Sequence, residues 1–346
     1  MIYTENYISD LTNAQKNVKN INVLNNSKIL ITGAGGLICS AIVDFLLQIN
    51  KTNNSNISVY CAARNYEKIE KRFLDKVSDS GFNFIKYDAL EPINSEIDFD
   101  YIIHGASNAN PSLYVEQPVE TIMANFLGLK NILDYSKKHN TKKVLYISSS
   151  EVYGKKTSEQ PYNENEYGFL DILNPRACYP SSKRASETLC VAYLKQYEVE
   201  SVIVRPGHIY GPTMTDSDTR ASSQFPKDVL NGKDIVMKSL GTQLRSYCYV
   251  IDCVSAIMTV LLNGKSGEAY NISNKHSVVT IRELAECFAL VGGKKVIFDI
   301  PTDAEKAGYN LMDNSSLTSD KLESIGWQGE FDLRRGVEAT LDAARE

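Results

Sequence analysis

From residue 28 onward, short runs rich in β-branched residues alternate with stretches of helical periodicity, and this alternation strongly limits the possible folds. The runs read KILIT, ISVYCA, FNFIKY, DYIIHGA, KKVLYIS and SVIVRP. Helical patterns are expected at 36–49, 66–78, 118–138 and 179–197. Strands that alternate with helices pair in parallel and are covered by helices on both faces. The sequence therefore predicts an α/β fold built on a doubly wound parallel sheet of six or more strands.

A chain of 346 residues has room for about two structural units. The alternating pattern fills residues 27–205. After this part the loops lengthen and Gly, Pro, Ser and Thr concentrate, which predicts a smaller C-terminal α/β lobe over 206–346. Residues 1–26 are polar and rich in Asn, and we expect an added N-terminal arm there. Its apolar positions, which fit one weakly amphipathic helix, are Ile8, Leu11, Val18 and Ile21.

The charge and cysteine content exclude several classes of protein. With 37 Lys+Arg against 42 Asp+Glu and no basic run, the chain lacks the clustered positive charge that nucleic acid requires. The seven cysteines are odd in number and show no C-x-x-C spacing, so neither a disulfide framework nor a metal site is indicated. The N-terminus has no signal-peptide pattern, and no apolar stretch approaches about 18 residues. We therefore expect a soluble, cytoplasmic protein without a membrane partner.

The segment TGAGGLIC, residues 32–39, follows the first expected strand and opens the first helix. A glycine-rich turn can be purely structural, but the strand-turn-helix context favours a Rossmann-type dinucleotide site. Glycines allow a tight turn and a close approach of the backbone to a pyrophosphate, and the helix N-terminus offers unpaired N–H groups. The predicted cofactor-binding residues in this turn are Gly33, Gly35, Gly36, Leu37 and Ile38. Cys39 stands where the third glycine of the pattern is expected.

The choice between NAD and NADP depends on the end of the second strand, which reads CAARN. An acidic residue there would hold the ribose 2′-hydroxyl of NAD, but none is present. Arg64 could instead face the 2′-phosphate of NADP, or it is an ordinary solvated loop residue. Asp88, after the third strand, is placed to meet the adenine amino group, although a plain strand-end aspartate is an equally simple interpretation. Both cofactors therefore stay open.

A tyrosine and a lysine four residues apart, Tyr179 and Lys183, lie on one face of the helix after the fifth strand. A phenol with a pKa near 10 is a poor base at neutral pH, and a neighbouring cation lowers that pKa. A Y-x-x-x-K spacing is usually structural. Its place downstream of a dinucleotide turn favours Tyr179 as the catalytic acid and base, with Lys183 as the group that lowers its pKa. Both are also expected to contact the cofactor.

Hydroxyl groups and a carboxylate follow the fifth strand in SSSEVYG, residues 148–154. The carboxyl ends of the strands are where doubly wound sheets bind ligands. Ser149 is expected to hydrogen-bond the hydroxyl being oxidised. Alcohol oxidation alone needs no carboxylate, so Glu151 indicates proton movement at a neighbouring carbon, unless it only caps the loop. Arg205 and His208 end the sixth strand and lead into the second lobe, which makes them candidate substrate ligands.

Together these segments resemble the extended short-chain dehydrogenase/reductase family of nucleotide-sugar epimerases, dehydratases and decarboxylases, over about residues 28–342. The likeness is greatest to UDP-glucuronate decarboxylases, carried by HGASNANPSLY, SSSEVYG, NPRACYPSSKRASETLCVAYLKQ and GTQLRSY. The resemblance implies a catalytic set of Ser149, Ser150, Glu151, Tyr179 and Lys183. It also implies substrate contacts from Tyr114, Ser150, Arg205, His208 and Arg245, cofactor contacts from Ala106 and Asn125, and a homodimer packed through 118–138 and 179–197.

This sequence departs from the family pattern in three places. His208 replaces an asparagine, the ribose-binding acid is missing, and Cys39 replaces the third glycine. The expected activity is oxidation of carbon 4 of a nucleotide sugar with bound NAD(P), most like the redox-neutral UDP-glucuronate decarboxylase reaction, with a second lobe that binds the substrate. A 4,6-dehydratase, a 4-epimerase and a 4-keto reductase stay open as alternatives. An alternative of another class is a non-catalytic module that senses NAD(P).

Overall fold

Seven parallel strands form the main sheet of the protein, in the order β10-β6-β5-β4-β1-β2-β3. The computed structural model describes residues 3–156, 159–300 and 313–345. The strands are β1 (Lys28–Thr32), β2 (Ser58–Ala63), β3 (Phe82–Lys86), β4 (Tyr101–His104), β5 (Lys143–Ile147), β6 (Ser201–Pro206) and β10 (Ala269–Ile272). The six strands expected from the sequence are β1 to β6, and the predicted α/β class is confirmed.

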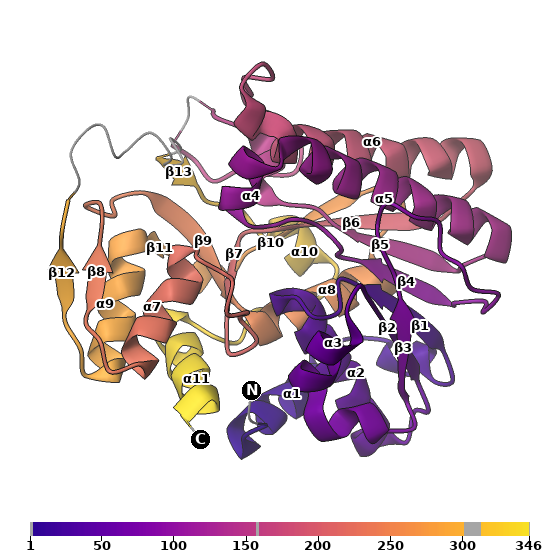
Figure 1. The fold of residues 1–346 in the computed structure, drawn as a ribbon, viewed down its shortest axis with the longest axis horizontal. Coiled ribbons are helices and arrows are strands. Elements are labelled where there is room, and N and C mark those ends of the chain that lie inside the picture. The colour runs from indigo at the N-terminus through magenta and orange to yellow at the C-terminus, as the bar shows by residue number, and fades with distance from the viewer. Residues whose placement is uncertain (1–2, 157–158, 301–312, 346) are drawn as a thin grey trace.

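Helices cover both faces of this sheet (Figure 1). They are α2 (Leu37–Asn53), α3 (Tyr66–Phe73), α5 (Pro118–His139), α6 (Cys178–Tyr197) and α8 (Val250–Asn263). The helix expected over 66–78 is shorter than predicted, because Leu74 has a φ of 45° and the chain continues as a 3-10 turn over Leu74–Ser78. Among the described residues, no helix has the length and apolar character needed to cross a membrane.

The alternation of buried side chains along β1 shows why the sheet needs both helical layers. Ile29 and Ile31 pack in the core that contains α2 and α8, whereas Leu30 packs in the core under α5 and α6. All three are fully buried. Burying an aliphatic side chain contributes about 1.5–3 kcal/mol, so a strand with apolar residues on both faces is stable only between two layers.

A smaller lobe is built around β9 (Leu244–Tyr249). This strand pairs with β7 (His208–Tyr210), β11 (Val278–Thr280) and β13 (Asn314–Ser315), while β8 (Ile235–Met237) pairs with β12 (Val296–Phe298). Helices α7 (Ala221–Leu230), α9 (Ile281–Gly292) and α11 (Leu333–Arg345) accompany these strands. The later part of the chain also returns to the main sheet through α8 and β10, so the two sheets are interleaved along the sequence.

The N-terminal segment is a docked helix. It forms α1 (Glu5–Lys16) and a 3-10 turn (Ile21–Leu24), and α1 packs against α2, α8 and α11 (Figure 1). Tyr7 and Leu11 are buried, but the helix ends before Val18, so the single helix expected through Ile21 is wrong. The reason is that Asn20 adopts a left-handed conformation with a φ of 64°, after which the chain continues as the 3-10 turn.

Asp44 on α2 holds α1 in place. Its buried carboxylate accepts hydrogen bonds from the hydroxyls of Tyr3 (2.9 Å) and Tyr7 (3.0 Å). It also pairs with Arg72 (2.7 Å) and Lys76 (3.2 Å). Burial opposes ionisation of Asp44, but the two cations outweigh it and hold the pKa of this carboxyl below its ordinary value. On its other side α1 reaches the small lobe.

We expect Asp44→Asn to lower the free energy of unfolding by about 3 kcal/mol, because Arg72 and Lys76 would be left without their buried counter-charge. Urea unfolding measures the change. The matched control is Asp98→Asn, which removes an exposed carboxylate paired with His139 and should change stability by less than about 0.5 kcal/mol. Equal losses in both variants would contradict an anchoring role for Asp44.

Candidate active site

The turn between β1 and α2 is shaped to receive a phosphate group. Gly33 has a φ of 71°, and a Cβ at this position would lie 2.9 Å from the backbone of Gly105 and Ala106. Gly36 is the N-cap of α2 and offers no side-chain cap. The N–H groups of Leu37 and Ile38 therefore begin the helix without intrahelical partners. Backbone amides and the positive end of a helix dipole fit a dinucleotide pyrophosphate.

Cys39 can take the place of the third glycine because the segment after the neighbouring strand β4 has a glycine opposite it. Cys39 is buried on α2, and a Cβ added to Gly105 would collide with its Sγ atom. The space that a glycine on the helix would supply comes instead from a glycine after β4. The close packing of helix on strand is thus kept, and the missing glycine removes no backbone ligand.

The residues expected near the adenosine ribose and the base lie at strand ends on the same side of the sheet. Arg64 follows β2 and is exposed, as the interpretation of an NADP ligand requires. Asp88 follows β3, is exposed, and accepts the amide of Leu90 at 3.0 Å, as an ordinary strand-end aspartate does. Their contacts with a cofactor stay predictions.

Lys183 is buried on α6 with its ammonium close to the end of β5. Its Nζ atom donates to the carbonyl of Ile147 at 2.8 Å and lies 5.6 Å from the centre of the Tyr179 ring. It also lies 4.7 Å from the centre of the Tyr146 ring. Burial lowers the pKa of Lys183 to about 7, although the carboxylate of Glu187 acts in the opposite direction. The spacing in the sequence thus places the cation beside the phenol.

The electrostatics of Tyr179 differ from the expectation. Burial and the neighbouring Glu151 raise the pKa of its phenol to about 12, although hydrogen bonds from Ser149 and Tyr114 lower it. We predicted a pKa lowered by Lys183. The structure reverses the direction because desolvation of the phenolate outweighs the nearby groups that favour it. In this state Tyr179 holds its proton at neutral pH.

Tyr114 supports the catalytic phenol. It lies in α4 (Pro111–Glu116), is buried, and stacks on Tyr179 with ring centres 4.5 Å apart and an angle of 13°. The residue expected to contact the sugar therefore also fixes the orientation of the phenol.

The turn after β5 carries Ser149 and Glu151. Ser149 precedes a 3-10 turn over Ser150–Tyr153, and its Oγ atom accepts the amide of Glu151 at 3.1 Å. Burial raises the pKa of Glu151, while positive charges from three arginines oppose the shift. These arginines are Arg176, which lies 3.9 Å from the carboxylate, Arg220 and Arg245.

A pocket brings most of the predicted catalytic residues together. Its walls are formed by Ala109, Pro111, Tyr114, Ser149, Ser150, Glu151, Tyr179, Gly207, His208, Arg220 and Ser315. Of the residues expected to bind substrate, Tyr114, Ser150 and His208 thus line one cavity together with the catalytic set. Arg245 lies on β9 and acts on this cavity through its charge on Glu151.

His208 faces the pocket as a neutral side chain. Burial, followed by the charges of Arg245 and Arg220, lowers the pKa of its imidazole to about 3. Its Nδ1 atom has no hydrogen-bond partner within the described part of the chain. A neutral ring offers a ligand one donor and one acceptor. His208 is therefore suited to sugar hydroxyls and not to pairing with a phosphate.

Arg205 does not reach the pocket, contrary to the prediction. It is buried, and its Nη2 atom pairs with Glu187 at 2.6 Å. Its Nη1 atom donates to the hydroxyl of Tyr153 and the carbonyl of Glu164. These internal bonds occupy the guanidinium, so the expected substrate contact is replaced by a structural role.

Asn125 is likewise committed inside the protein. Its Oδ1 atom accepts the hydroxyl of Ser107 at 2.6 Å, and its Nδ2 atom donates to Ser182 at 2.9 Å. The side chain is almost completely buried. It joins the segment after β4 to α6 and uses its polar atoms there, which corrects the expectation of a direct cofactor contact. Ala106, which underlies Gly33, keeps its place beside the phosphate turn.

Two arginines of this site, Arg176 and Arg220, were missed in the sequence. Arg220 precedes α7 and is oriented by Asp218, with a separation of 2.5 Å between the charged groups. Arg176 stands three residues before Tyr179, in the turn that leads into α6, and this spacing could have pointed to it. Arg220 has no such local signal, and only the fold brings it to Glu151.

The epimerase model of the NAD dependent epimerase/dehydratase family matches residues 29–273. The chain belongs to this family. It is 32% identical over 319 residues to UDP-glucuronic acid decarboxylase 6 of Arabidopsis thaliana, covering 90% of this chain and 87% of the relative. It is 29% identical over 333 residues to UDP-glucuronic acid decarboxylase 1 of Xenopus tropicalis, covering 95% and 75%. Members of this family depend on NAD, which agrees with the dinucleotide site predicted from the phosphate turn.

Solved structures of the family have the same fold. UDP-glucose 4-epimerase of Thermotoga maritima, determined with UDP-glucose, gives a TM-score of 0.76 at 21% identity and covers 91% of this chain and 98% of its own. The dTDP-glucose 4,6-dehydratase of Streptomyces venezuelae, determined with NAD, gives 0.77 at 22% identity and covers 92% and 97%. The predicted fold, including the smaller C-terminal lobe, is confirmed.

The contact between Cys39 and Gly105 leads to a testable prediction. Gly105→Ala should lower the free energy of unfolding by about 2 kcal/mol, because its Cβ meets the sulfur. In a Cys39→Gly background the same change should cost at least about 1 kcal/mol less. Urea unfolding of the four proteins measures this coupling.

The control for this cycle is Gly35→Ala, whose Cβ would meet only the Cδ1 atom of Ile69 at 3.4 Å, an ordinary contact. Its cost should not depend on residue 39. Additive effects of the Cys39 and Gly105 substitutions would show that the two positions do not share the space.

Proposed function

We propose that this protein catalyses the redox-neutral decarboxylation of UDP-glucuronate to UDP-xylose. The observation that carries the proposal is the positive charge around Glu151, where Arg176, Arg220 and Arg245 act beside the catalytic pocket. A sugar carboxylate joined to a diphosphate is an anionic ligand that such a field attracts. The relatives named above, both UDP-glucuronic acid decarboxylases, support the same substrate.

The turn from Gly33 to Gly36 and the start of α2 would hold the dinucleotide through backbone N–H groups. NAD bound there supplies a reversible hydride acceptor for carbon 4 of the sugar. Lys183 places its ammonium beside Tyr179. Because burial raises the pKa of the phenol, this cation is needed if Tyr179 is to give up its proton. Arg64 stays a proposed ligand for a 2′-phosphate, should the protein use NADP.

Tyr179 removes the proton of the carbon-4 hydroxyl and later returns it, while Ser149 hydrogen-bonds the same oxygen. The resulting ketone makes the sugar a β-keto acid, whose carboxylate leaves as carbon dioxide because its electrons delocalise into the carbonyl. Burial raises the pKa of Glu151 above its ordinary value, and this carboxyl is placed to govern protonation at carbon 5, directly or through water. After carbon 5 is protonated, the hydride returns to carbon 4 and Tyr179 returns the proton to its oxygen, so the reaction needs no external oxidant or reductant.

A nucleotide-sugar 4,6-dehydratase is the second candidate. The same ketone would acidify the carbon-5 proton, Glu151 would remove it, and water would leave from carbon 6. The residue before this glutamate is Ser150, which cannot supply a proton as an acid would, and this favours decarboxylation. A 4-epimerase would leave Glu151 without a task, and a non-catalytic NAD(P) sensor would have no use for paired Tyr179 and Lys183.

Incubation with UDP-glucuronate should yield UDP-xylose and carbon dioxide, followed by NMR of the sugar and by gas release. In Tyr179→Phe, turnover should fall at least about a hundredfold with NAD binding retained, because the variant loses only the proton carrier. A product that keeps carbon 6 would favour the dehydratase. Absence of carbon dioxide at saturating cofactor would reject the decarboxylase.

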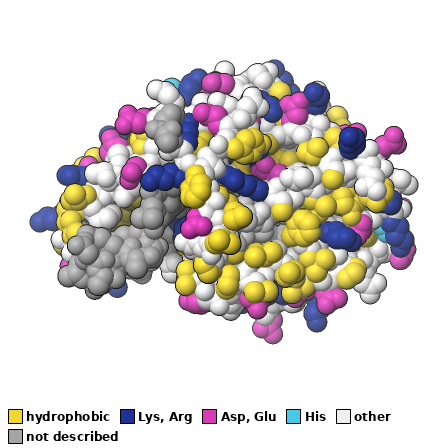
Figure 2. Space-filling view, turned by 90° about the horizontal axis from the view of Figure 1, so that it is seen from above, with side chains coloured by type: hydrophobic (Ala, Val, Ile, Leu, Met, Phe, Trp, Pro, Cys, Tyr) yellow, Lys and Arg dark blue, Asp and Glu magenta, His cyan; other side chains and the backbone are white. Residues whose placement is uncertain are grey.

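We also propose that the protein is a homodimer packed through α5 and α6. Figure 2 shows hydrophobic side chains gathered over these helices. On α5 they are Val119, Ile122, Met123 and Phe126, each more than a third exposed. Their spacing of three and four residues makes one stripe along the helix. Such a patch on a folded protein is typical of an interface with another chain.

Met123→Glu should convert the dimer to a monomer, because it places a charge in the middle of the apolar stripe. Light scattering coupled to size exclusion measures the mass. Lys138→Glu, at an exposed position near the end of the same helix, is the control and should leave the dimer intact. A monomeric unmodified protein would refute this interface.

A further inference from the structure

Helix α6 carries a buried carboxylate one turn after the catalytic lysine. The proposed reaction does not use this carboxylate. Glu187 follows Lys183 by one turn of the helix. Its Oε1 atom accepts the hydroxyl of Ser148 at 2.6 Å and Nε of Arg205 at 3.0 Å, and its Oε2 atom accepts Nη2 of Arg205 at 2.6 Å. Glu187 and both partner residues are largely excluded from solvent.

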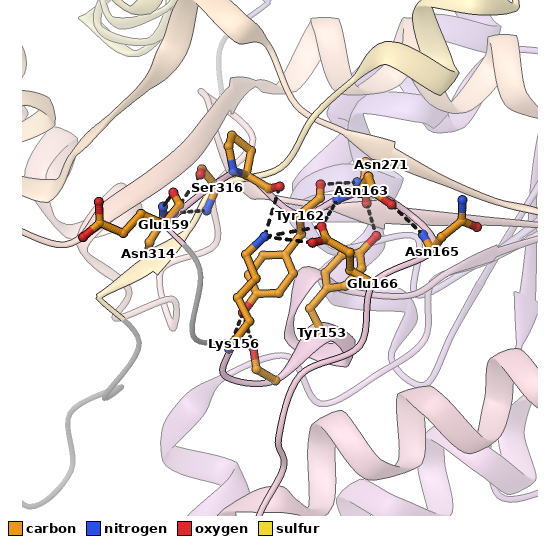
Figure 3. Close-up of polar contacts among 12 residues, drawn as sticks. Tyr153, Lys156, Glu159, Tyr162, Asn163, Asn165, Glu166, Asn271, Asn314 and Ser316 are labelled. Carbon is orange, nitrogen blue, oxygen red and sulfur yellow. Dashed lines mark hydrogen bonds and ion pairs between the residues drawn. The ribbon is translucent and has the colours of Figure 1, made fainter.

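The ion pair is fixed from several sides. Arg205 donates to the hydroxyl of Tyr153 at 2.9 Å, which in turn donates to Asn271 on β10 at 2.6 Å. Figure 3 shows Tyr153 next to Tyr162 below Asn271, and the rings of the two tyrosines stack 4.8 Å apart. The backbone amide of Asn271 donates to Glu164 at 2.8 Å. The carboxylate of Glu187 is therefore held at one position inside the protein and cannot turn toward solvent.

The ionisable groups around the Lys183 ammonium come from four elements. They are Tyr179, Glu187 and Cys190 on α6, Cys39 on α2, Tyr146 on β5 and His104 on β4. Of these, Glu187 alone is a carboxylate. Burial raises the pKa of each thiol and of Tyr146 and Tyr179, and it lowers the pKa of His104, so these groups are neutral at pH 7.

Lys183 and Glu187, one helical turn apart, bind the consecutive residues Ile147 and Ser148 at the end of β5. We propose that Glu187 is a positioning residue whose carboxylate, clamped by Arg205 and Ser148, supplies a fixed negative charge beside the Lys183 ammonium, which the Ile147 carbonyl holds near Tyr179. The inference rests on the proposed function, in which that ammonium supports proton transfer by Tyr179. It adds to that function a counter-charge which touches neither substrate nor cofactor. Ser148 is next to Ser149, so the same carboxylate also fixes the start of the catalytic turn.

The sign of the effect follows from the environment of Lys183. Burial lowers the pKa of Lys183 to about 7, and Glu187 acts against that shift. Removal of the carboxylate lowers the pKa further. A fall of about one unit would leave about fivefold less ammonium at pH 7, since a group at its pKa is half protonated and one unit above it about a tenth.

The first experiment measures Lys183 without substrate. Protein labelled with 13C-lysine is titrated by NMR, and the Lys183 signal is assigned with Lys183→Arg. Glu187→Gln should lower the titration midpoint of Lys183 by about one pH unit, whereas Glu187→Asp should restore it. Asp134→Asn is the matched control, because it removes a carboxylate that binds α6 through Tyr193, ten residues along the helix from Lys183. An unchanged midpoint in folded Glu187→Gln would overturn the proposal.

Glu187→Gln leaves Arg205 buried without its counter-charge and could fail to fold. The double variant Glu187→Gln/Arg205→Met removes both charges and tests the same point in a stable protein. It should still show a fall in the Lys183 midpoint, smaller than in Glu187→Gln because the removed arginine charge had acted against the carboxylate. A double variant with the midpoint of the unmodified protein would also overturn the proposal.

The second experiment uses turnover of UDP-glucuronate. The fall of kcat at high pH, where Lys183 loses its proton, should begin about one pH unit lower in Glu187→Gln and stay unchanged in Asp134→Asn. A loss of kcat by the same factor at every pH would show a purely structural role. If the unmodified protein does not act on UDP-glucuronate, the proposed function fails, and the NMR titration still decides the role of Glu187.

Discussion

The buried ion pair between Arg205 and Glu187 is the interaction on which the site depends. It connects the end of β6 to α6 and, through Ser148, to the end of β5. Every catalytic segment leaves from one of these points: the turn with Glu151 follows β5, Tyr179 is on α6, and His208 follows β6. A buried ion pair costs desolvation energy and adds little net stability, so its value here is the fixed arrangement of three chain segments.

Two opposite pKa shifts define the chemistry of the pocket. Burial raises the pKa of Tyr179 and lowers that of Lys183, so each group alone is driven toward its neutral form. An ammonium close to a phenol favours the phenolate, and a phenolate favours the ammonium, so the pair becomes reactive as a unit. Charges that stabilise one member therefore act on both. This coupling makes distant carboxylates, which touch no substrate, part of the acid-base chemistry.

The sequence predicts the parts of the structure that depend on local pattern. Strands β1 to β6 and the phosphate turn follow from β-branched runs, helical periodicity and glycine spacing, all visible within about ten residues. Strand β10 was missed because its four residues, AYNI, include a single β-branched one and lie outside the alternating part of the chain. Arg205 was misassigned because a strand-end arginine looks the same whether it faces a ligand or Glu187. Arg220 reaches the pocket only through tertiary folding, which no local spacing records.

The N-terminal helix α1 restricts the relative motion of the main sheet and the small lobe. On one side α1 is joined to α2 through Asp44, and on the other Asp10 accepts the hydroxyl of Tyr249 at the end of β9 at 3.3 Å. In Figure 1, α1 lies at the bottom of the molecule and α4, which carries Tyr114, lies near the top. Helix α1 thus connects the two sheets on the side of the molecule away from α4. This connection resists a hinge motion that would separate the main sheet from the small lobe. We therefore expect a ligand to enter through displacement of the loops at the rim of the pocket, while the angle between the two lobes stays the same.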